Sequence, residues 1–151
     1  MEKLLISACL LGERCRYDGA SKPLPEEILT LLRARYLLLP VCPERDGGLP
    51  IPRIPSERRG TYVVNRAGEN VTAFYRRGAA LALRTARENG CTRALLKERS
   101  PSCGSGEIYD GSFTGKRIAG DGVAAELLKA AGLTVYEESE IAKLLQDDTG
   151  Q

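Results

Sequence analysis

The stretch "PEEILTLLRARYLLLPVCPE", residues 25–44, decides the fold because a helix pattern runs directly into a buried-strand pattern. Its first part, 25–36, begins with proline, carries two glutamates in the first turn and ends in arginine, as an amphipathic helix does. The apolar run "LLLPVCPE" (37–44), closed by Pro43, predicts a buried strand. Another apolar run, "KLLISACL" (3–10), predicts a strand before the helix. Together these segments predict a parallel strand–helix–strand unit.

The same alternation continues along the chain. "TAFYRRGAALALRTARENG" (72–90) predicts a long helix, with Thr72 as its N-cap and Gly90 as its C-terminal stop. A third strand is expected at 91–98, a helix at 123–132, a fourth strand at 133–138 and a closing helix at 139–147 capped by Ser139. The segments "TYVVN" and "NVT" around "RAGE" predict a small hairpin, whereas 45–60 and 99–122 are expected to be irregular.

This order predicts an α/β fold: a single three-layer domain with a small, mostly parallel Rossmann-like sheet of about four strands and flanking helices. The domain is expected to span residues 1–147, and residues 148–151 are expected to be a frayed tail. A chain of 151 residues is long enough for one core and too short for two comfortable domains.

Charge and hydropathy narrow the function. Twenty-two Lys and Arg against twenty Asp and Glu leave a formal net charge of +2, which argues against bulk nucleic-acid binding. No apolar stretch approaches the length of a membrane span. The amino-terminal residues fit a strand better than a signal peptide, so a cytoplasmic location is expected. The sequence does not indicate an oligomeric state.

Five cysteines and no histidine limit the chemistry of any site. The missing histidine excludes Ser-His-Asp and Cys-His nucleophilic sites and any zinc site with a histidine ligand. In a reducing cytoplasm, cysteines serve metal binding, catalysis or packing rather than a disulfide framework. Any metal would therefore be held by Cys, carboxylate or backbone groups.

The predicted strands place most of the thiols at one edge of the sheet. Cys9 ends the first strand, Cys42 ends the second, and Cys103 lies on the loop leaving the third. Ligand sites of open parallel sheets lie beyond the carboxyl ends of the strands. Cys15 is expected near the same edge, whereas Cys91 begins a strand at the opposite edge and is assigned to packing. Simple packing is the competing interpretation for Cys9 and Cys42.

Cys103 has a distinctive setting. It lies in "KERSPSCGSG" (97–106), a loop of small residues without apolar partners of its own, so burial is not expected there. Three thiolates without histidine suit a soft metal centre. A [4Fe–4S] cluster held by three cysteines leaves one iron without a protein ligand and open to substrate.

Four motifs then identify a resemblance that covers nearly the whole chain. These are "SACLLGERCRYDGASK" (7–22), "PVCPERDGGLPIPRIPSE" (40–57), "KERSPSCG" (97–104) and "IYDGSFTG" (108–115) followed by "GDGVAAELL" (120–128). In this order they resemble the bacterial domain of unknown function 523 family, to which the TudS-type thiouracil desulfidases belong.

The resemblance implies an iron–sulfur-dependent desulfidase that replaces C=S by C=O in a thiolated nucleobase such as 2- or 4-thiouracil and releases sulfide. It implies that Cys9, Cys42 and Cys103 bind a [4Fe–4S] cluster whose open iron takes the thione sulfur. It also implies that Glu44 and Ser100 are catalytic. Cys15 lies in a family motif but is not assigned to the cluster. The expected partner is a small-molecule thiolated nucleobase or nucleotide.

The residue types agree with this chemistry. A soft thione sulfur suits a soft-ligated iron, and Glu44 follows a ligand closely enough to act as general base for an attacking water. Ser100 is expected to bind the ring or orient the water. The competing hypotheses are a non-catalytic metal or iron–sulfur binding module and a thiol redox protein. The loop residues Arg16, Asp18, Lys22, Arg53, Tyr109 and Asp110 are candidate substrate contacts, with solvated loop charge or turn formation as the simpler interpretation of each.

Overall fold

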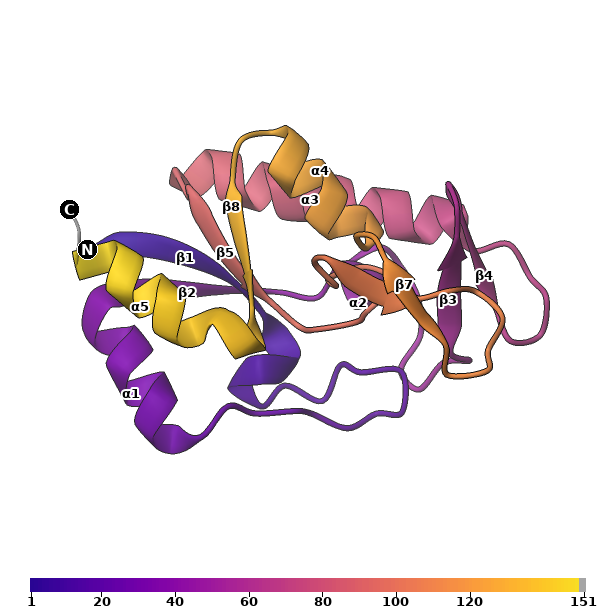
Figure 1. Cartoon of the computed structure of the whole chain (residues 1–151), viewed down its shortest axis with the longest axis horizontal. Helices are drawn as coiled ribbons and strands as arrows, with labels where there is room; N and C mark the ends of the chain where they lie inside the picture. The colour runs from indigo at the N-terminus through magenta and orange to yellow at the C-terminus, as the bar shows by residue number, and fades with distance from the viewer. Residues whose placement is uncertain (150–151) are drawn as a thin grey trace.

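A four-stranded parallel sheet forms the centre of the computed structural model, which describes residues 1–149. Its strand order is β2-β1-β5-β8 (Figure 1). The strands are β1 (Glu2–Ser7), β2 (Tyr36–Val41), β5 (Arg93–Leu96) and β8 (Thr134–Glu137). β1 pairs with β2 on one side and β5 on the other, so it lies inside the sheet, and all six of its residues pair with β2. The predicted α/β fold with a small parallel sheet and flanking helices is confirmed.

Helices cover both faces of the sheet, as the alternation of strands and helices predicts. One face packs against α1 (Glu26–Arg35) and α5 (Ile141–Thr149), and the other against α3 (Thr72–Asn89) and α4 (Val123–Ala130) (Figure 1). Alternate residues of β1 serve the two cores: Leu4 and Ile6 face α1 and α5, whereas Leu5 faces α3 and α4. Both faces of this strand are buried, which explains its continuous apolar run.

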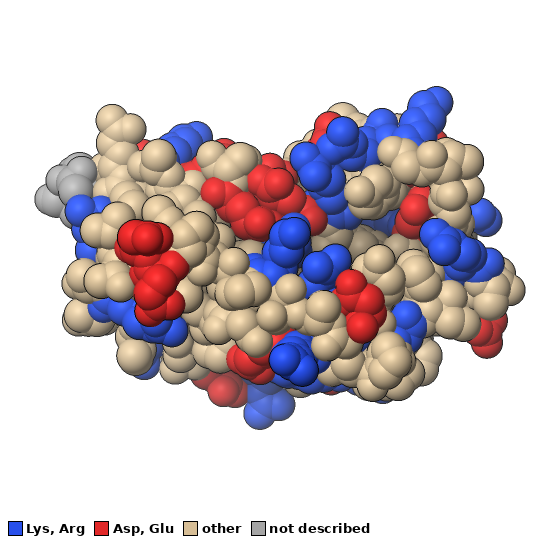
Figure 2. Space-filling model, turned by 90° about the horizontal axis from the view of Figure 1, so that it is seen from below, with Lys and Arg blue, Asp and Glu red and all other residues tan. Residues whose placement is uncertain are grey.

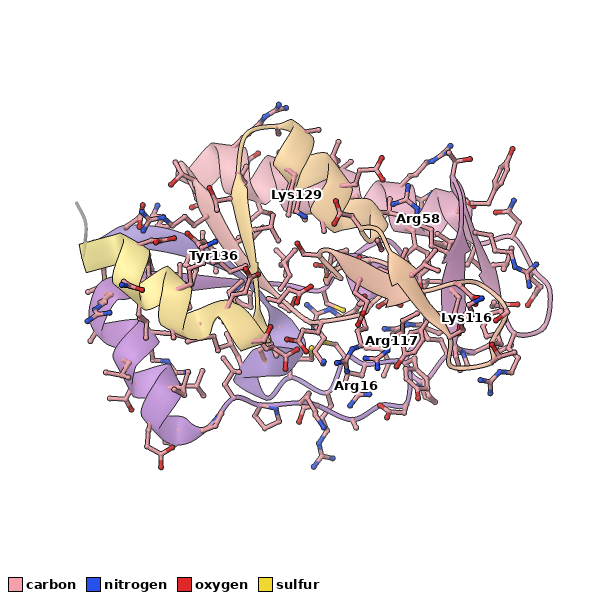
Figure 3. The ribbon with its side chains drawn as sticks, viewed as in Figure 1. Arg16, Arg58, Lys116, Arg117, Lys129 and Tyr136 are labelled. Atoms are coloured by element: carbon pink, nitrogen blue, oxygen red, sulfur yellow. The ribbon has the colours of Figure 1, made fainter. Side chains whose placement is uncertain are left out.

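Each end of the sheet has its own device. β2 is an edge strand, where Pro40 costs no ladder hydrogen bond on the open side. At the other edge, Tyr136 of β8, labelled in Figure 3, donates a 2.7 Å hydrogen bond to Asp147 and so fixes α5 to the sheet. Within residues 1–149, no helix is both long and apolar enough to cross a membrane.

Two antiparallel hairpins lie beyond the carboxyl ends of the strands. They are β3 (Ser56–Arg59) with β4 (Tyr62–Asn65), and β6 (Glu107–Tyr109) with β7 (Arg117–Ala119). Arg58, labelled in Figure 3, connects the first hairpin to the start of α4 by donating to the Asp121 carbonyl (2.7 Å) and pairing with Glu126 (2.6 Å). Glu57 accepts the backbone N–H groups of Gly111 and Phe113, which joins the two hairpins.

The hairpins correct the sequence prediction. Residues 45–60 were expected to be irregular, yet they contain β3 and the end of the one-turn helix α2 (Pro43–Asp46). The strand at 62–65 therefore pairs with 56–59, and only the Val64–Asn70 bridge remains of the expected pairing with 70–72. The loop 99–122 contains β6 and β7. Proline and glycine spacing gave no sign of these short strands, because their pairing depends on tertiary contacts.

Several element ends also differ from the prediction. β1 stops at Ser7, and a 3₁₀ turn, η1 (Ala8–Leu11), follows it. Gly90 ends α3 in the left-handed conformation (φ 68°), as predicted, but Thr72 is the first residue of that helix and not its cap. Before α5 lies the turn η2 (Glu138–Glu140), closed by a capping box between Glu137 and Glu140 instead of by Ser139. Helix α5 includes positions 148 and 149 of the expected tail, and positions 150–151 lie outside the described residues.

Candidate functional site

A cavity of about 520 Å³ lies at the carboxyl ends of β1, β2 and β5, between the sheet and the two hairpins. This is the position expected for the ligand of an open parallel sheet, because the chain changes direction along the sheet between β1 and β5. Cys9, Cys42, Cys103, Glu44 and Ser100 all line the cavity. Figure 2 shows basic and acidic side chains next to one another around a hollow in this face.

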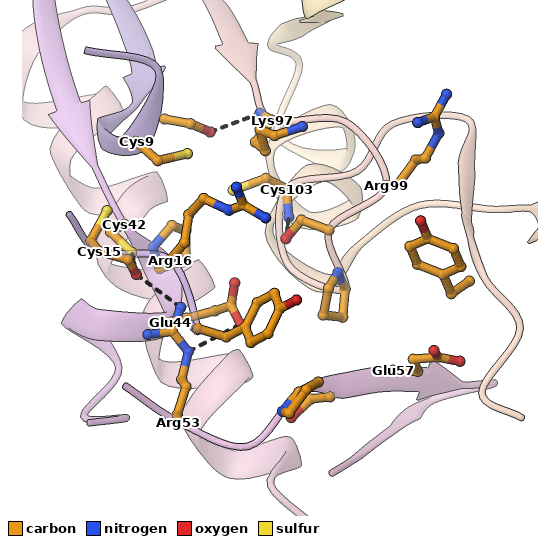
Figure 4. Close-up of a pocket in the computed structure, with 18 of the residues that line it drawn as sticks. Cys9, Cys15, Arg16, Cys42, Glu44, Arg53, Glu57, Lys97, Arg99 and Cys103 are labelled. Atoms are coloured by element: carbon orange, nitrogen blue, oxygen red, sulfur yellow. Dashed lines mark hydrogen bonds and ion pairs between the residues drawn. The ribbon is translucent and has the colours of Figure 1, made fainter. Parts of the chain in front are cut away.

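Cys9 is placed by the turn that follows β1. It belongs to η1, one residue beyond the last strand position, and not to the strand itself as the sequence suggested. Gly12 closes this turn at φ 98°, where a side chain would be strained. The thiol is buried, and burial together with the nearby Cys42 raises the pKa of Cys9 to about 11. Figure 4 shows Cys9 and Cys103 facing each other across the cavity.

Cys42 lies between the end of β2 and the start of α2. Its backbone N–H donates to Asp46 Oδ2 (3.0 Å), which fixes the turn into that helix. Its sulfur lies beside Cys15, 3.7 Å from the Cys15 carbonyl oxygen. Donation by the Cys15 thiol lowers the pKa of Cys42 to about 7, and the same contact raises the pKa of Cys15. Cys42 is therefore the most acidic of the cavity thiols, and Cys15 is its protonated neighbour.

Cys103 is buried, contrary to the expectation from its loop of small residues. The Ser100 hydroxyl oxygen accepts the backbone N–H groups of Ser102 and Cys103, both at 3.0 Å, so the chain turns tightly there. The Ser102 carbonyl accepts two backbone N–H groups of the first turn of α4. A Cβ atom on Gly122 would overlap Ser102, so small residues let this loop pack against the helix. Burial raises the pKa of Cys103 to about 12.

Glu44 follows Cys42 on α2, and two side chains hold one of its carboxylate oxygens. Tyr75 of α3 donates its hydroxyl to Glu44 Oε1 at 2.5 Å, and Arg53 Nε lies 3.5 Å from the same oxygen. Oε2 makes no hydrogen bond or ion pair with any residue that the structure describes. The Glu44 side chain is 17% exposed and lines the cavity, so it presents a free, oriented carboxylate oxygen there.

The weaker candidates divide into two groups. Arg16, Arg53 and Tyr109 line the cavity, whereas Asp18, Lys22 and Asp110 do not. Sequence reasoning missed other charged and aromatic lining residues: Tyr17, Glu57, Arg66, Lys97, Glu98, Arg99 and Phe113. Lys97 and Glu98 directly follow β5, so the strand-end rule that located Cys9 also applies to them. The others lie in or beside the hairpins, whose position no local pattern indicates.

Cys91 lies apart from this site. It precedes β5 at the opposite edge of the sheet, where it packs against the core beneath α3 and α4. Its pKa is raised, chiefly by burial. This placement agrees with the packing role expected from the sequence.

The donor set fits an iron–sulfur cluster better than a single ion. Cys9, Cys42 and Cys103 are free thiols that line one cavity with no histidine nearby, which is the ligand chemistry of a cluster. Among residues 1–149, no three Cys, Asp or Glu side chains are arranged to hold one metal ion. A single zinc ion brings thiolate sulfurs to within about 4 Å of one another, because each Zn–S bond is about 2.3 Å. A four-iron cluster receives its thiolates at separate irons and needs the wider cavity.

The fold and cavity define an α/β protein with a cysteine-lined site at the switch point of its sheet. The chain belongs to the 2-thiouracil desulfurase family, whose model matches residues 4–140. It is 43% identical to a Bacillus subtilis (strain 168) protein named "Uncharacterized protein YbbK" over 152 residues, which cover 94% of this chain and 99% of that protein. It is also similar to the solved structure of the [4Fe-4S]-dependent thiouracil desulfidase TudS, with a TM-score of 0.95, 46% identity and full coverage of both chains.

Proposed function

We propose that this protein is a [4Fe–4S]-dependent desulfidase that replaces C=S by C=O in a thiolated nucleobase such as 2- or 4-thiouracil. Water supplies the oxygen, the sulfur leaves as sulfide, and no electrons are exchanged with another molecule. Membership of the 2-thiouracil desulfurase family and the likeness to TudS support the reaction. The substrate is taken to be a small-molecule base or nucleotide.

One observation carries the proposal to this chain. Three buried, free cysteines from separate strand ends, Cys9, Cys42 and Cys103, line the same cavity as the Glu44 carboxylate. A binding module needs only the thiols, whereas hydrolysis also needs a base beside the reacting atoms. We assign the three cysteines as cluster ligands. With the cluster bound, the iron that has no protein ligand would supply a soft Lewis acid for the thione sulfur.

Glu44 acts as the general base. Its Oε2 accepts a proton from the attacking water while the water oxygen bonds to the thione carbon. The carboxyl group then returns this proton to the sulfur as the C–S bond breaks. Tyr75 keeps Oε1 occupied throughout, so the same oxygen of the carboxylate faces the cavity in both steps.

Ser100 has two roles in this proposal. Its oxygen accepts the N–H groups of residues 102 and 103, which orients the loop that carries Cys103. Its hydroxyl hydrogen remains available to donate into the cavity that Ser100 lines, toward the nucleobase ring or the water. Buried and aromatic surfaces around this position, including Tyr109, limit the access of bulk water.

Conversion of 2- and 4-thiouracil to uracil tests the proposal. Anaerobically reconstituted protein is expected to release one sulfide per uracil formed. Glu44→Gln is the matched variant, because it keeps the size and one hydrogen-bond acceptor but removes the base. It should keep its iron and lose about 10²–10⁴-fold in kcat. Turnover by Glu44→Gln equal to wild type would remove Glu44 as the base, and a loaded wild type without turnover would refute the desulfidase function.

A further inference from the structure

Arg53 carries the one buried side-chain N or O atom without a hydrogen-bond partner among the described residues. That atom is Nε, and the side chain is only 4% exposed. A buried N–H group without a partner costs about 1–3 kcal/mol. A protein that retains such a donor beside a cavity commonly satisfies it with a ligand or a bound water.

The rest of Arg53 is held in place. Its backbone N–H donates to the Tyr17 carbonyl at 2.8 Å, Nη2 donates to the Cys15 carbonyl at 3.0 Å, and Nη1 donates to the Pro50 carbonyl at 3.3 Å. These three bonds leave the planar guanidinium little freedom. Figure 4 shows Arg53 beside Glu44, with its guanidinium reaching toward Cys15. The Nε–H group therefore keeps its direction before any substrate binds.

Nε lies beside the Glu44 carboxylate without bonding to it. The 3.5 Å separation of Nε from Glu44 Oε1 is recorded as an ion pair, and this contact does not satisfy the Nε–H group. Oε1 already receives the Tyr75 hydroxyl. A water molecule at this position would accept from Nε–H and donate to the free carboxylate oxygen of Glu44. Such a water has both a positioned base and a positioned cationic donor.

We propose that Arg53 is a catalytic residue whose Nε–H group holds the attacking water and then the oxygen formed from it. This role rests on the desulfidase function proposed above. As Glu44 removes one proton, the water oxygen gains negative charge and bonds to the thione carbon. Arg53 donates to that oxygen while the C–S bond breaks and sulfide leaves with the protons of the water. In the product, the same N–H group donates to the new uracil carbonyl oxygen.

Two variants separate this role from simple support of the Cys15 loop. Arg53→Lys keeps the charge, and Arg53→Gln keeps a donor for the Cys15 carbonyl, but neither reproduces the fixed Nε–H. Arg84→Lys serves as control, because Arg84 is exposed on α3 and pairs only with Glu88. Each protein is reconstituted anaerobically. The readouts are kcat per cluster and KM for 4-thiouracil, iron per chain, and the calorimetric Kd for uracil.

The expected result is a fall of about 10²-fold in kcat per cluster for both Arg53 variants, as found when one charge-stabilising donor is lost. KM is expected to change by less than about threefold, because the donor contacts the water and not the thione. Uracil should bind about tenfold more weakly, since its carbonyl loses a charged donor. The Arg84→Lys control should match wild type in every readout.

Three outcomes contradict the role of Arg53. Loss of iron with kcat per cluster and uracil affinity unchanged would make Arg53 a loop support only. A wild-type kcat per cluster in either variant would overturn the proposal directly. If loaded wild-type protein converts no thiouracil, the desulfidase function itself fails and this role fails with it, and wild-type turnover distinguishes that case from the first two.

Discussion

Gly78 of α3 lies so close to Pro43 of α2 that a Cβ atom at position 78 would overlap the Pro43 carbonyl oxygen. Gly47 makes a similar backbone approach to Phe74 from the other side. Cys42 and Glu44 flank Pro43, so this contact between two helix backbones sets the position of a proposed ligand and of the proposed base. The long helix α3 therefore serves the site without lining the cavity at Gly78.

Gly78→Ala should destabilise the protein by about 1–3 kcal/mol, because overpacking a close backbone contact forces one helix to move. Helix propensity alone predicts the opposite sign, a gain of up to about 1 kcal/mol. Urea unfolding of the protein measures the difference, and iron content after reconstitution should fall as well. Ala80→Ser, at an exposed position of the same helix, should change stability by less than about 0.5 kcal/mol. A stabilised Gly78→Ala variant would show that the contact is loose.

Tyr75→Phe should lower kcat and leave KM nearly unchanged, because the lost hydroxyl orients Glu44 and does not touch the substrate. We expect a fall of about tenfold, a fraction of the 10²–10⁴ that a general base contributes. Burial and the adjacent Glu44 raise the pKa of Tyr75, so the hydroxyl stays a donor at neutral pH. Steady-state kinetics on loaded protein provide the test. Tyr62→Phe, exposed on β4, is the control, and equal kcat values in the two variants would contradict the orienting role.

Cys15→Ser should keep the iron content of wild type, whereas Cys9→Ser, Cys42→Ser and Cys103→Ser should each reduce it strongly. The reason is that Cys15 donates to Cys42 and its backbone carbonyl supports Arg53, while the other three supply the cluster thiolates. Cys91→Ser, at the far edge of the sheet, controls for loss of a buried thiol. Iron assays after anaerobic reconstitution decide the matter. Loss of iron in Cys15→Ser with retention in Cys42→Ser would exchange the two assignments.

The topology and the main site residues are predictable because they depend on strong local patterns. The apolar runs around Leu5 and Leu38 and the helix pattern before β2 define the parallel sheet, and the sheet then fixes where strand-end residues such as Cys9 and Cys42 meet. The shared motifs supplied the roles of Glu44 and Ser100, which no spacing rule assigns.

The rest depends on contacts between distant segments. Burial of Cys103 arises from packing of its loop on α4, and the loop sequence alone contains no apolar partner for it. Tyr75 looked like one more buried aromatic of a helix, although its hydroxyl reaches Glu44, 31 residues away in sequence. Arg53 resembled a solvated loop charge, and only the folded structure shows that it is buried with an unpaired donor.

Glu98→Gln should destabilise the protein at pH 7 but not at about pH 3. Burial tends to raise the pKa of Glu98, but hydrogen bonds from Ser139, including a 2.8 Å backbone N–H bond, outweigh it and lower the pKa. A lowered folded-state pKa gives stability that is present above the unfolded-state pKa and is lost as the pH falls through the folded-state value. Urea unfolding at both pH values tests this. A gap between wild type and variant that persists at the lower pH would contradict it.

The most direct test of the central claim is the iron and acid-labile sulfide content of the protein purified and reconstituted without oxygen. The account predicts about four of each per chain, with both lost in Cys103→Ser and both retained in Cys91→Ser. Stoichiometric zinc, or no iron and sulfide in the wild-type protein, would contradict the cluster and with it the desulfidase chemistry proposed for this cavity.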